Sequence, residues 1–382
     1  MDTLQTSAET QIDDNKTTED FLPLKRIDYL EFYSGNAKQS AFFYQYVMGF
    51  KLTGYSGLET GNREKASYLL EQGKIRFVLS SPLTDDNFIA EHHKRHGDGV
   101  RDIAMEVDDA TRSYVETTNR GAKGVLKPTE YKDDNGVIIK SAIQTYGDTI
   151  HTFVERKNYK GLFMPGFISA ENKAVKGIKD TGLKAVDHIV GNVELGRMNE
   201  WVKFYAHTMG FNQLISFDDK DISTDYTALM SKVMQNGNGR IKFPINEPAP
   251  GKKKSQIEEY IDFYKSGGAQ HIAMSTANIL DTVNELKSRG LEFLTVPTSY
   301  YKELEARVGK IDEDVSELEK LGVLVDRDED GYLLQIFSKP IEDRPTVFFE
   351  IIQRKGARSF GKGNFKALFE AIEREQALRG TL

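Results

Sequence analysis

The chain has 382 residues, enough for two ordinary domains that each bury a core of their own. Its formal net charge of −7 argues against nucleic acid or an anionic membrane as a partner, because phosphate binding needs a basic face. The lack of cysteine excludes disulfides and thiolate metal sites, and no apolar run approaches the roughly 20 residues that a membrane span requires. We expect a cytoplasmic protein.

The chain begins with a polar, acidic segment, residues 1–21, that is nearly free of aromatic side chains. Such a composition cannot bury enough apolar surface to fold, so we expect a disordered tail. The segment also lacks a basic region followed by an apolar stretch, which argues against a secretory signal.

The rest of the first half alternates predicted strands with predicted helices. Glycines punctuate this pattern: Gly49 and Gly121 each end a helix, and Gln72-Gly73 predicts a hairpin turn. The elements are expected at residues 26–32 (strand), 37–47 (helix), 67–70 and 75–80 (strands), 102–107 (strand) and 110–119 (helix).

The second half repeats this plan after a polar junction at 159–183, which Pro165-Gly166 interrupts. Its elements are expected at residues 186–193 (strand), 198–209 (helix), 271–276 (strand) and 279–288 (helix). An amphipathic helix ends the chain, with Asn364 as its expected N-cap. Its apolar face is formed by Phe365, Leu368, Phe369 and Ile372.

An opening strand occurs twice in each half, so each half is itself expected to contain two related units. The result is an α+β fold of four βαβββ-like modules in two pairs. Several short strands accompany each helix, and a glycine-rich phosphate loop is absent from the sequence. Both features argue against a doubly wound parallel sheet.

The two halves also share short stretches of sequence in the same order, which indicates an internal duplication. The matched stretches are Tyr46–Phe50 with His207–Phe211, Val100–Met105 with Ala269–Met274, Arg120-Gly121 with Arg289-Gly290, Pro128-Thr129 with Pro297-Thr298, and Thr152–Glu155 with Val347–Glu350.

The copies differ at a few chemically important positions. Ile27-Asp28-Tyr29 matches Val186-Asp187-His188, and Asp102 matches His271. Two imidazoles in the second half therefore correspond to a phenol and a carboxylate in the first. On this alignment Glu155 retains the carboxylate of Glu350. We therefore predict a functional second half and a supporting first half.

His188, His271 and Glu350 form the candidate metal site of the second half. Two neutral imidazoles and one carboxylate suit a divalent first-row metal. When the three ligands occupy one face of the metal and leave the opposite coordination positions open, they suit non-haem Fe(II) and its chemistry with oxygen. Zinc accepts the same ligands, so ligand type alone does not select the metal. A single histidine on an apolar strand is more often a hydrogen-bonded core residue. Here the two halves share their apolar frame but differ at the histidine positions, and this difference favours His188 and His271 as metal ligands.

A second histidine group, His92, His93 and His96, has helical spacing but lies in a charged segment. We interpret it as an exposed helix end. His151 and His207 have no identifiable partner and are assigned to structure. Lys252-Lys253-Lys254 is expected to be a solvated loop.

Several ordered motifs resemble the 4-hydroxyphenylpyruvate dioxygenase family: Val186–Asn192, Pro244–Pro248, Lys254–Gln256, Gln270–Ala273, Gly331–Phe337 and Phe360–Phe365. The resemblance extends from about residue 22 to 378. It implies the vicinal oxygen chelate fold, in which paired βαβββ modules close into two open-barrel domains. The expected division is a non-catalytic barrel at 22–160, a linker at 161–182 and a catalytic domain at 183–382 whose last helix covers the pocket.

The resemblance also assigns roles to individual residues. It makes His188, His271 and Glu350 the Fe(II) ligands. The polar residues of the catalytic site are Ser231, Asn246, Gln256, Gln270 and Gln335, and the aromatic wall around the substrate ring is Phe337, Phe348, Phe360 and Phe365. By pattern alone, Asn246 is a turn residue, Gln256 belongs to a helix start, and the phenylalanines are ordinary core.

The implied reaction converts 4-hydroxyphenylpyruvate and O₂ to homogentisate and CO₂ by oxidative decarboxylation, ring hydroxylation and side-chain migration, as in tyrosine catabolism. Two other readings stay open. One is 4-hydroxymandelate synthase, with the same substrate and metal; the other is a non-enzymatic protein of the same fold that binds a small aromatic molecule. The family resemblance further implies a homo-oligomer, a dimer or a tetramer.

Overall fold

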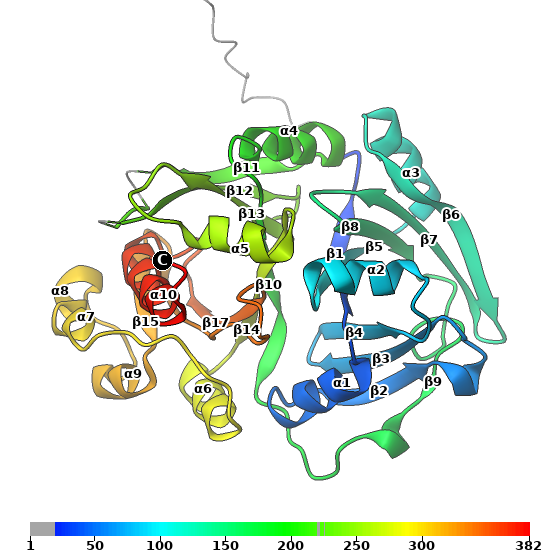
Figure 1. Cartoon of the computed structure of the whole chain (residues 1–382), viewed down its shortest axis with the longest axis horizontal. Helices are drawn as coiled ribbons and strands as arrows, with labels where there is room; N and C mark the ends of the chain where they lie inside the picture. Colours follow the sequence, from blue (N-terminus) through cyan, green and yellow to red (C-terminus); the bar gives the residue numbers. More distant parts are fainter. Residues whose placement is uncertain (1–19, 220–221, 225) are drawn as a thin grey trace, which may run out of the picture.

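The computed structural model describes residues 20–219, 222–224 and 226–382, so the predicted tail falls outside it except for its last two residues. Two mixed β-sheets stand side by side, one from each half of the chain (Figure 1). Among the described residues, no helix is long and apolar enough to cross a membrane.

The first sheet has nine strands in the order β6-β7-β8-β5-β1-β4-β3-β2-β9. Its strands are β1 (Leu24–Tyr33), β2 (Lys51–Ser56), β3 (Lys65–Gln72), β4 (Ile75–Pro82), β5 (Gly99–Val107), β6 (Gly124–Asp133), β7 (Gly136–Gln144), β8 (Ile150–Glu155) and β9 (Ile168–Ser169). Its helices are α1 (Ala37–Tyr46), α2 (Phe88–His96) and α3 (Ala110–Asn119).

The second sheet has eight strands in the order β11-β12-β13-β10-β14-β17-β16-β15. Its strands are β10 (Leu183–Asn192), β11 (Asn212–Phe217), β12 (Ala228–Gln235), β13 (Lys242–Ala249), β14 (Gly268–Thr276), β15 (Leu324–Asp328), β16 (Gly331–Phe337) and β17 (Phe348–Lys355). Its helices are α4 (Met198–Met209), α5 (Gln256–Tyr264), α6 (Ile279–Ser288), α7 (Ser299–Lys302), α8 (Leu304–Val308), α9 (Val315–Leu321) and α10 (Phe365–Arg379).

The predicted four-module plan is confirmed. Each module is a strand, a helix and three strands, and its first strand pairs in parallel with its last: β1 with β4, β5 with β8, β10 with β13, and β14 with β17. The last module differs because the short helices α7 to α9 stand between α6 and β15. The matched pair Pro128-Thr129 and Pro297-Thr298 is therefore not equivalent in structure, since only the first lies in a strand.

The helix starts follow from local capping. The Ser255 hydroxyl accepts a hydrogen bond from Glu258 N (3.3 Å), while Glu258 Oε2 accepts one from Ser255 N (2.7 Å). This reciprocal pair fixes the start of α5 and thereby the position of Gln256. Asn278 caps α6 in a simpler way, through a bond from Asp281 N to its Oδ1 (3.2 Å).

The two sheets share one apolar core. Phe349 of β17 contacts the rings of Phe77 and Tyr44 from the first half, at centroid distances of 6.1 and 6.0 Å. His151 stacks on Phe243 of the second half at 5.3 Å, and its Nε2 lies 2.8 Å from the Tyr205 hydroxyl. His151 is thus a structural residue, as predicted.

The prediction of an exposed helix end at His92, His93 and His96 is wrong for two of the three. His92 and His96 are 2% and 0% exposed, because α2 packs against α5 across the boundary between the halves. The His96 ring stacks on Tyr264 of α5 at 4.3 Å, and its Nε2 lies 2.7 Å from Asp148 Oδ2. The lysines at 252–254 are exposed, as expected.

Candidate active site

Three neighbouring central strands of the second sheet bring the predicted ligands together. His188 lies on β10, His271 on β14 and Glu350 on β17, and all three are buried. One ligand atom from each lies within 4.8 Å of the others. His188 Nε2 and His271 Nε2 lie 3.2 and 3.5 Å from the same oxygen, Glu350 Oε2. The three donors converge on one point.

A β-bulge precedes each imidazole. In the pairing of β10 with β14, Asp187 is the extra residue before His188, and Gln270 is the extra residue before His271. Bulges commonly redirect side chains next to active sites. Here each bulged residue contacts the ring that follows: Asp187 Oδ1 lies 2.8 Å from His188 Nδ1, and Gln270 Oε1 lies 3.2 Å from His271 Nδ1. Both Nε2 atoms are thereby left to face Glu350.

The charges of the cluster suit a metal site. Burial would raise the pKa of Glu350, but the adjacent imidazoles of His188 and His271 lower it to about 2, so the carboxylate is ionised. Burial lowers the pKa of His271, which favours the neutral, ligating ring. Burial also acts to lower the pKa of His188, yet Glu350 and Asp187 outweigh it and raise the pKa. A metal ion must displace that proton, so its affinity rises with pH.

The five predicted polar residues are all buried and lie on the elements around this cluster. Ser231 of β12 pairs across the sheet with Asn246 of β13. Gln256, at the start of α5, accepts a hydrogen bond from Gln270 Nε2 to its Oε1 (3.4 Å). Gln335 of β16 is 2% exposed, and its Oε1 has no partner among the described residues. Asn246 is thus a strand residue rather than a turn residue.

The predicted aromatic residues surround the imidazoles. Phe348 stacks on His271 at 4.7 Å, Phe337 lies edge-on to the same ring at 6.0 Å, and Phe360 lies edge-on to His188 at 4.9 Å. Phe365 is half-buried and packs on Phe217 at 5.0 Å rather than on an imidazole. Three of the four phenylalanines therefore border the metal cluster directly.

Helix α10 lies across the open side of the second sheet (Figure 1). Its Leu368 and Ile372 join a cluster with Phe337 and Phe348, while Phe369 joins a cluster with Phe360. A cavity of only about 30 Å³, lined in part by Gln256, Gln270, Phe348 and Ile372, remains beneath it. That volume has room for roughly two waters, so α10 packs closely against the residues beneath it.

The start and end of α10 are held by contacts that the sequence did not indicate. Asn364 stands at the N-cap position but makes no capping bond; its Oδ1 accepts from the Tyr300 hydroxyl instead (2.6 Å). At the other end, Arg379 Nη2 donates to both oxygens of Glu259 on α5, at 3.0 and 2.8 Å. The predicted Asn364 cap is therefore wrong in its contact, although right in its position.

Two further polar residues lie on β10, the strand that carries the predicted ligand His188. Asp187 contacts a ligand ring, and its recurrence as Asp28 was visible in the sequence. Asn192 shares a face of β10 with His188, because side chains alternate along a strand. Both amide atoms of Asn192 are buried without a partner among the described residues. Asn192 ends the motif Val186–Asn192 that carries the family resemblance, but the sequence assigned it no role.

The first half contains a counterpart of this cluster with different side chains. Asp102 of β5 pairs with Ile150 of β8, and His271 of β14 pairs with Phe348 of β17 in the same way. Thr152 stands two residues after Ile150, and Glu350 stands two residues after Phe348. Thr152, rather than Glu155, is thus the counterpart of Glu350. The Asp102 carboxylate accepts hydrogen bonds from the Tyr29 hydroxyl (3.1 Å) and from Thr152 Oγ1 (2.6 Å).

The alignment of Glu155 with Glu350 is therefore wrong. Glu155 pairs with Val107 at the far end of the strands. Its carboxylate binds Lys157 (2.9 Å) and accepts from the backbone N of Ala110 (3.2 Å) at the start of α3. The first half has neither the imidazoles nor the carboxylate of the second.

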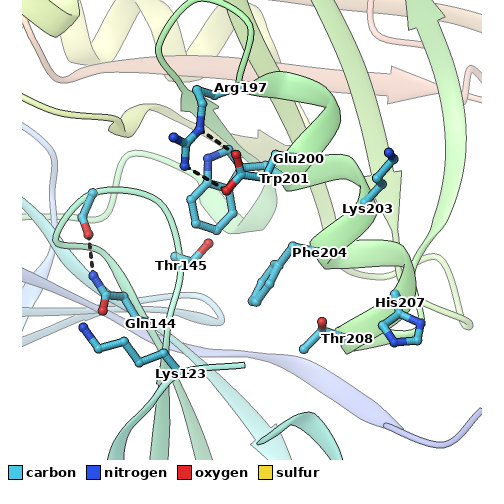
Figure 2. A pocket seen from close by; sticks show the side chains of 11 residues that line it. Lys123, Gln144, Thr145, Arg197, Glu200, Trp201, Lys203, Phe204, His207 and Thr208 are labelled. Atoms are coloured by element: carbon cyan, nitrogen blue, oxygen red, sulfur yellow. Dashed lines mark hydrogen bonds and ion pairs between the residues drawn. The ribbon is translucent and has the colours of Figure 1, made fainter. Parts of the chain in front are cut away.

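A wider groove of about 780 Å³ lies elsewhere, between α4 and the first half, and shares no residue with the metal cluster. Figure 2 shows Trp201 and Phe204 on one side and Lys123 and Gln144 on the other. The predicted structural residue His207 lies at its edge and is exposed. The lining of this groove has one histidine and one glutamate, and so does not repeat the two imidazoles and one carboxylate of the cluster.

Comparisons with known proteins agree with this geometry. The family model described as "Hydroxyphenylpyruvate dioxygenase, HPPD, N-terminal" matches residues 19–168. The model described as "Glyoxalase/Bleomycin resistance protein/Dioxygenase superfamily" matches residues 185–336. The first match spans β1 to β8, and the second runs from β10 into β16 and ends before β17.

Individual relatives match nearly the whole chain. A 4-hydroxyphenylpyruvate dioxygenase from Yarrowia lipolytica is 47% identical, with 93% of each chain covered. One from Dictyostelium discoideum is also 47% identical, covering 94% of this chain and 100% of its own. A solved structure of a 4-hydroxymandelate synthase variant from Streptomyces coelicolor superimposes with a TM-score of 0.82 at 28% identity, covering 93% of this chain and 100% of its own.

Proposed function

The chain belongs to the 4-hydroxyphenylpyruvate dioxygenase family, and from this premise we propose that it converts 4-hydroxyphenylpyruvate and O₂ to homogentisate and CO₂ in tyrosine catabolism. The observation that carries the proposal is the buried His188–His271–Glu350 cluster with its aromatic surroundings. In the reaction the α-keto acid loses CO₂, one oxygen atom enters the new carboxylate, and the other becomes the ring hydroxyl while the side chain migrates.

Fe(II) is the proposed cofactor, with His188, His271 and Glu350 as its ligands. Support comes from the donor set: two imidazole Nε2 atoms face one ionised carboxylate, which is the pattern of non-haem Fe(II) oxygenases. The α-keto acid carries a carboxylate and a keto oxygen that suit the remaining open positions. Bound there, Fe(II) supplies the one-electron chemistry through which O₂ reacts with an organic substrate.

The proposed substrate pocket lies between this cluster and α10. Phe337, Phe348 and Phe360 exclude water and hold the substrate ring near the cluster. The phenol end is oriented by neutral donors and acceptors, which need no counter-charge. We assign this role to Ser231, Asn246, Gln256, Gln270 and Gln335, with Phe365 completing the apolar wall.

The proposed domain roles follow from the contrast between the halves. Residues 183–382 act as the catalytic domain, residues 22–160 as the non-catalytic barrel, and residues 161–182 as the linker. In support, the first half places Tyr29, Asp102 and Thr152 where the second has the metal ligands.

An anaerobic Fe(II) titration tests the metal assignment. Wild-type protein is expected to bind one Fe(II) and then to consume O₂ when 4-hydroxyphenylpyruvate is added. His271→Ala should lose both properties, because two ligands do not hold the ion. Asp102→Ala, the same change in the first half, should retain them. Equal losses in both variants, or no iron binding by the wild type, would contradict the assignment.

A second candidate is 4-hydroxymandelate synthase, which the structural likeness to the Streptomyces coelicolor protein favours. The 28% identity to that protein is well below the 47% identity to dioxygenases, so the dioxygenase is preferred. A non-enzymatic protein that binds small aromatic molecules is disfavoured, because such a protein has no need of a complete ligand set.

We also propose that the protein is a homo-oligomer, a dimer or a tetramer, that works in the cytoplasm. The support is an apolar surface on the first half: Phe42 and Tyr46 of α1 stack on each other at 6.0 Å while 56% and 48% exposed. A subunit contact here would remove both rings from water. Phe42→Glu should lower the mass measured by sedimentation equilibrium; an unchanged mass would place the interface elsewhere.

A further inference from the structure

The bulged residue Asp187 connects a metal ligand to an arginine. Its Oδ1 lies 2.8 Å from His188 Nδ1, and both of its oxygens accept hydrogen bonds from Arg354, from Nε and from Nη2, at 2.8 Å each. An ionised carboxylate only accepts, so the imidazole carries a hydrogen on Nδ1, and Nε2 is the nitrogen that faces Glu350 and that a metal would take. The bidentate arginine fixes the plane of the carboxylate.

Arg354 also holds the segment that leads into α10. Its Nη1 donates to the carbonyl oxygens of Ser359 (2.6 Å) and Ala357 (3.3 Å). Its guanidinium lies 5.5 Å from the ring of Phe360, which in turn borders His188. One side chain therefore touches both the support of a metal ligand and the start of the lid segment, residues 357–379.

We propose that Arg354 is a positioning residue that couples metal binding at His188 to closure of the lid segment. The proposal rests on the metal site of the proposed function. A metal ion on Nε2 requires the ring orientation that Asp187 enforces, and Asp187 keeps its orientation only while Arg354 grips both oxygens. In that position the guanidinium also directs Nη1 at the carbonyl oxygens of Ala357 and Ser359. Metal binding and docking of the lid segment therefore favour the same conformation of Arg354.

The internal duplication supplies a matched control. In the first half, Arg156 grips both oxygens of Asp28, at 2.6 to 2.9 Å, and donates from Nη1 to the carbonyl of Phe163. The Phe163 ring borders Tyr29 at 5.4 Å, as Phe360 borders His188. Among the described residues, this copy keeps the arginine–aspartate pair but has no imidazole, no second carbonyl contact and no lid helix, and Asp28 also accepts a hydrogen bond from Arg76 (3.1 Å).

The experiment compares Arg354→Lys with Arg156→Lys in the full chain. Lysine keeps the charge but lacks the planar fork that reaches the carboxylate and the carbonyls together. Two quantities are measured: Co(II) affinity by titration calorimetry, and hydrogen–deuterium exchange of residues 357–379 with and without Co(II). In the wild type, Co(II) should slow the exchange of this segment.

Arg354→Lys should bind Co(II) about 10- to 100-fold more weakly. At saturating Co(II) its lid segment should exchange as fast as without the metal. Arg156→Lys should lose thermal stability but keep its Co(II) affinity within about twofold of the wild type and keep the slowing of exchange.

The outcomes separate the coupling from the metal site. Wild-type affinity in Arg354→Lys, a retained slowing of its lid exchange, or equal losses in Arg156→Lys would each overturn the coupling while leaving the metal site intact. Failure of the wild type to bind Co(II) would instead overturn the metal site, and the coupling with it.

Discussion

At the scale of single residues, the site depends on what surrounds each ligand as much as on the ligand. His188 and Tyr29 occupy matched positions, and each comes directly after an aspartate whose two oxygens are held by an arginine. Tyr29 donates its hydroxyl hydrogen to Asp102 (3.1 Å), and burial holds the pKa of this phenol well above its usual value. The two halves therefore differ at these matched positions in side chains rather than in fold: Tyr29, Asp102 and Thr152 stand where the second half has two imidazoles and one carboxylate.

Asp102 provides a prediction about pH. Burial raises the pKa of its carboxyl from 3.8 to about 6 in the folded protein. Between these values the native state binds more protons than the unfolded state, so this group contributes stability below pH 4 that is lost as the pH rises through 6.

Asp102→Asn removes the stability loss that follows ionisation of Asp102. The free energy of unfolding of the variant minus that of the wild type should therefore increase from pH 4.5 to pH 7.5. At 1.36 kcal/mol per pKa unit, the change has a ceiling of roughly 3 kcal/mol. Urea unfolding of both proteins at the two pH values measures it. A difference between the two proteins that stays constant with pH would show that Asp102 is not a buried titrating carboxyl.

At the scale of elements, the start of α5 matters because it places Gln256 against Gln270. Ser255→Ala removes the capping bond to Glu258 N and should lower the free energy of unfolding by about 1 kcal/mol. It should also raise KM for 4-hydroxyphenylpyruvate, because the Gln256 amide loses its fixed position.

Asn278→Ala is the matched control for this prediction, since it uncaps α6 away from the pocket. It should cost similar stability, measured by urea unfolding, without changing KM in steady-state assays. If both variants changed KM alike, the effect would reflect general loosening of the fold rather than the position of Gln256.

The sequence identified the elements and the three residues of the buried cluster because both are marked by local patterns. The alternation of strands and helices marked the modules, and His188 and His271 stood out against their counterparts Tyr29 and Asp102. Register is not local. The match of Thr152–Glu155 with Val347–Glu350 placed Glu155 opposite Glu350, whereas the hydrogen-bonded pairing of β5 with β8 places Thr152 there.

Burial between distant elements was equally hidden. His92 and His96 lie in a charged stretch, and their burial depends on α5, whose residues are far away in the sequence. The role of Arg354 was hidden for the same reason: its partner Asp187 lies on β10, while Arg354 lies near the end of β17. Contacts of this kind become visible only once the sheet is assembled.

At the scale of the whole molecule, the two halves share one core and should unfold together. Phe349 packs on Phe77 and Tyr44, and His151 packs on Phe243, so separating the sheets would expose apolar surface on both. Calorimetry of the full chain should show a single transition, with equal calorimetric and van't Hoff enthalpies.

Residues 183–382 produced alone should accordingly lack a cooperative transition, because the surface that covers Phe349 and Phe243 is missing. Two separate transitions in the full chain, or an isolated second half that unfolds cooperatively and binds Fe(II), would show that the first half is not required for the fold of the site.

The identity of the product tests the central claim most directly. Full-length protein with Fe(II), 4-hydroxyphenylpyruvate and O₂ should release CO₂ and homogentisate, identified by chromatography against standards and by a proton spectrum with three ring protons and a CH₂ group. The isomeric 4-hydroxymandelate would instead give four ring protons in a para pattern. That product, or no turnover by iron-loaded protein, would contradict the assignment of this site to ring hydroxylation.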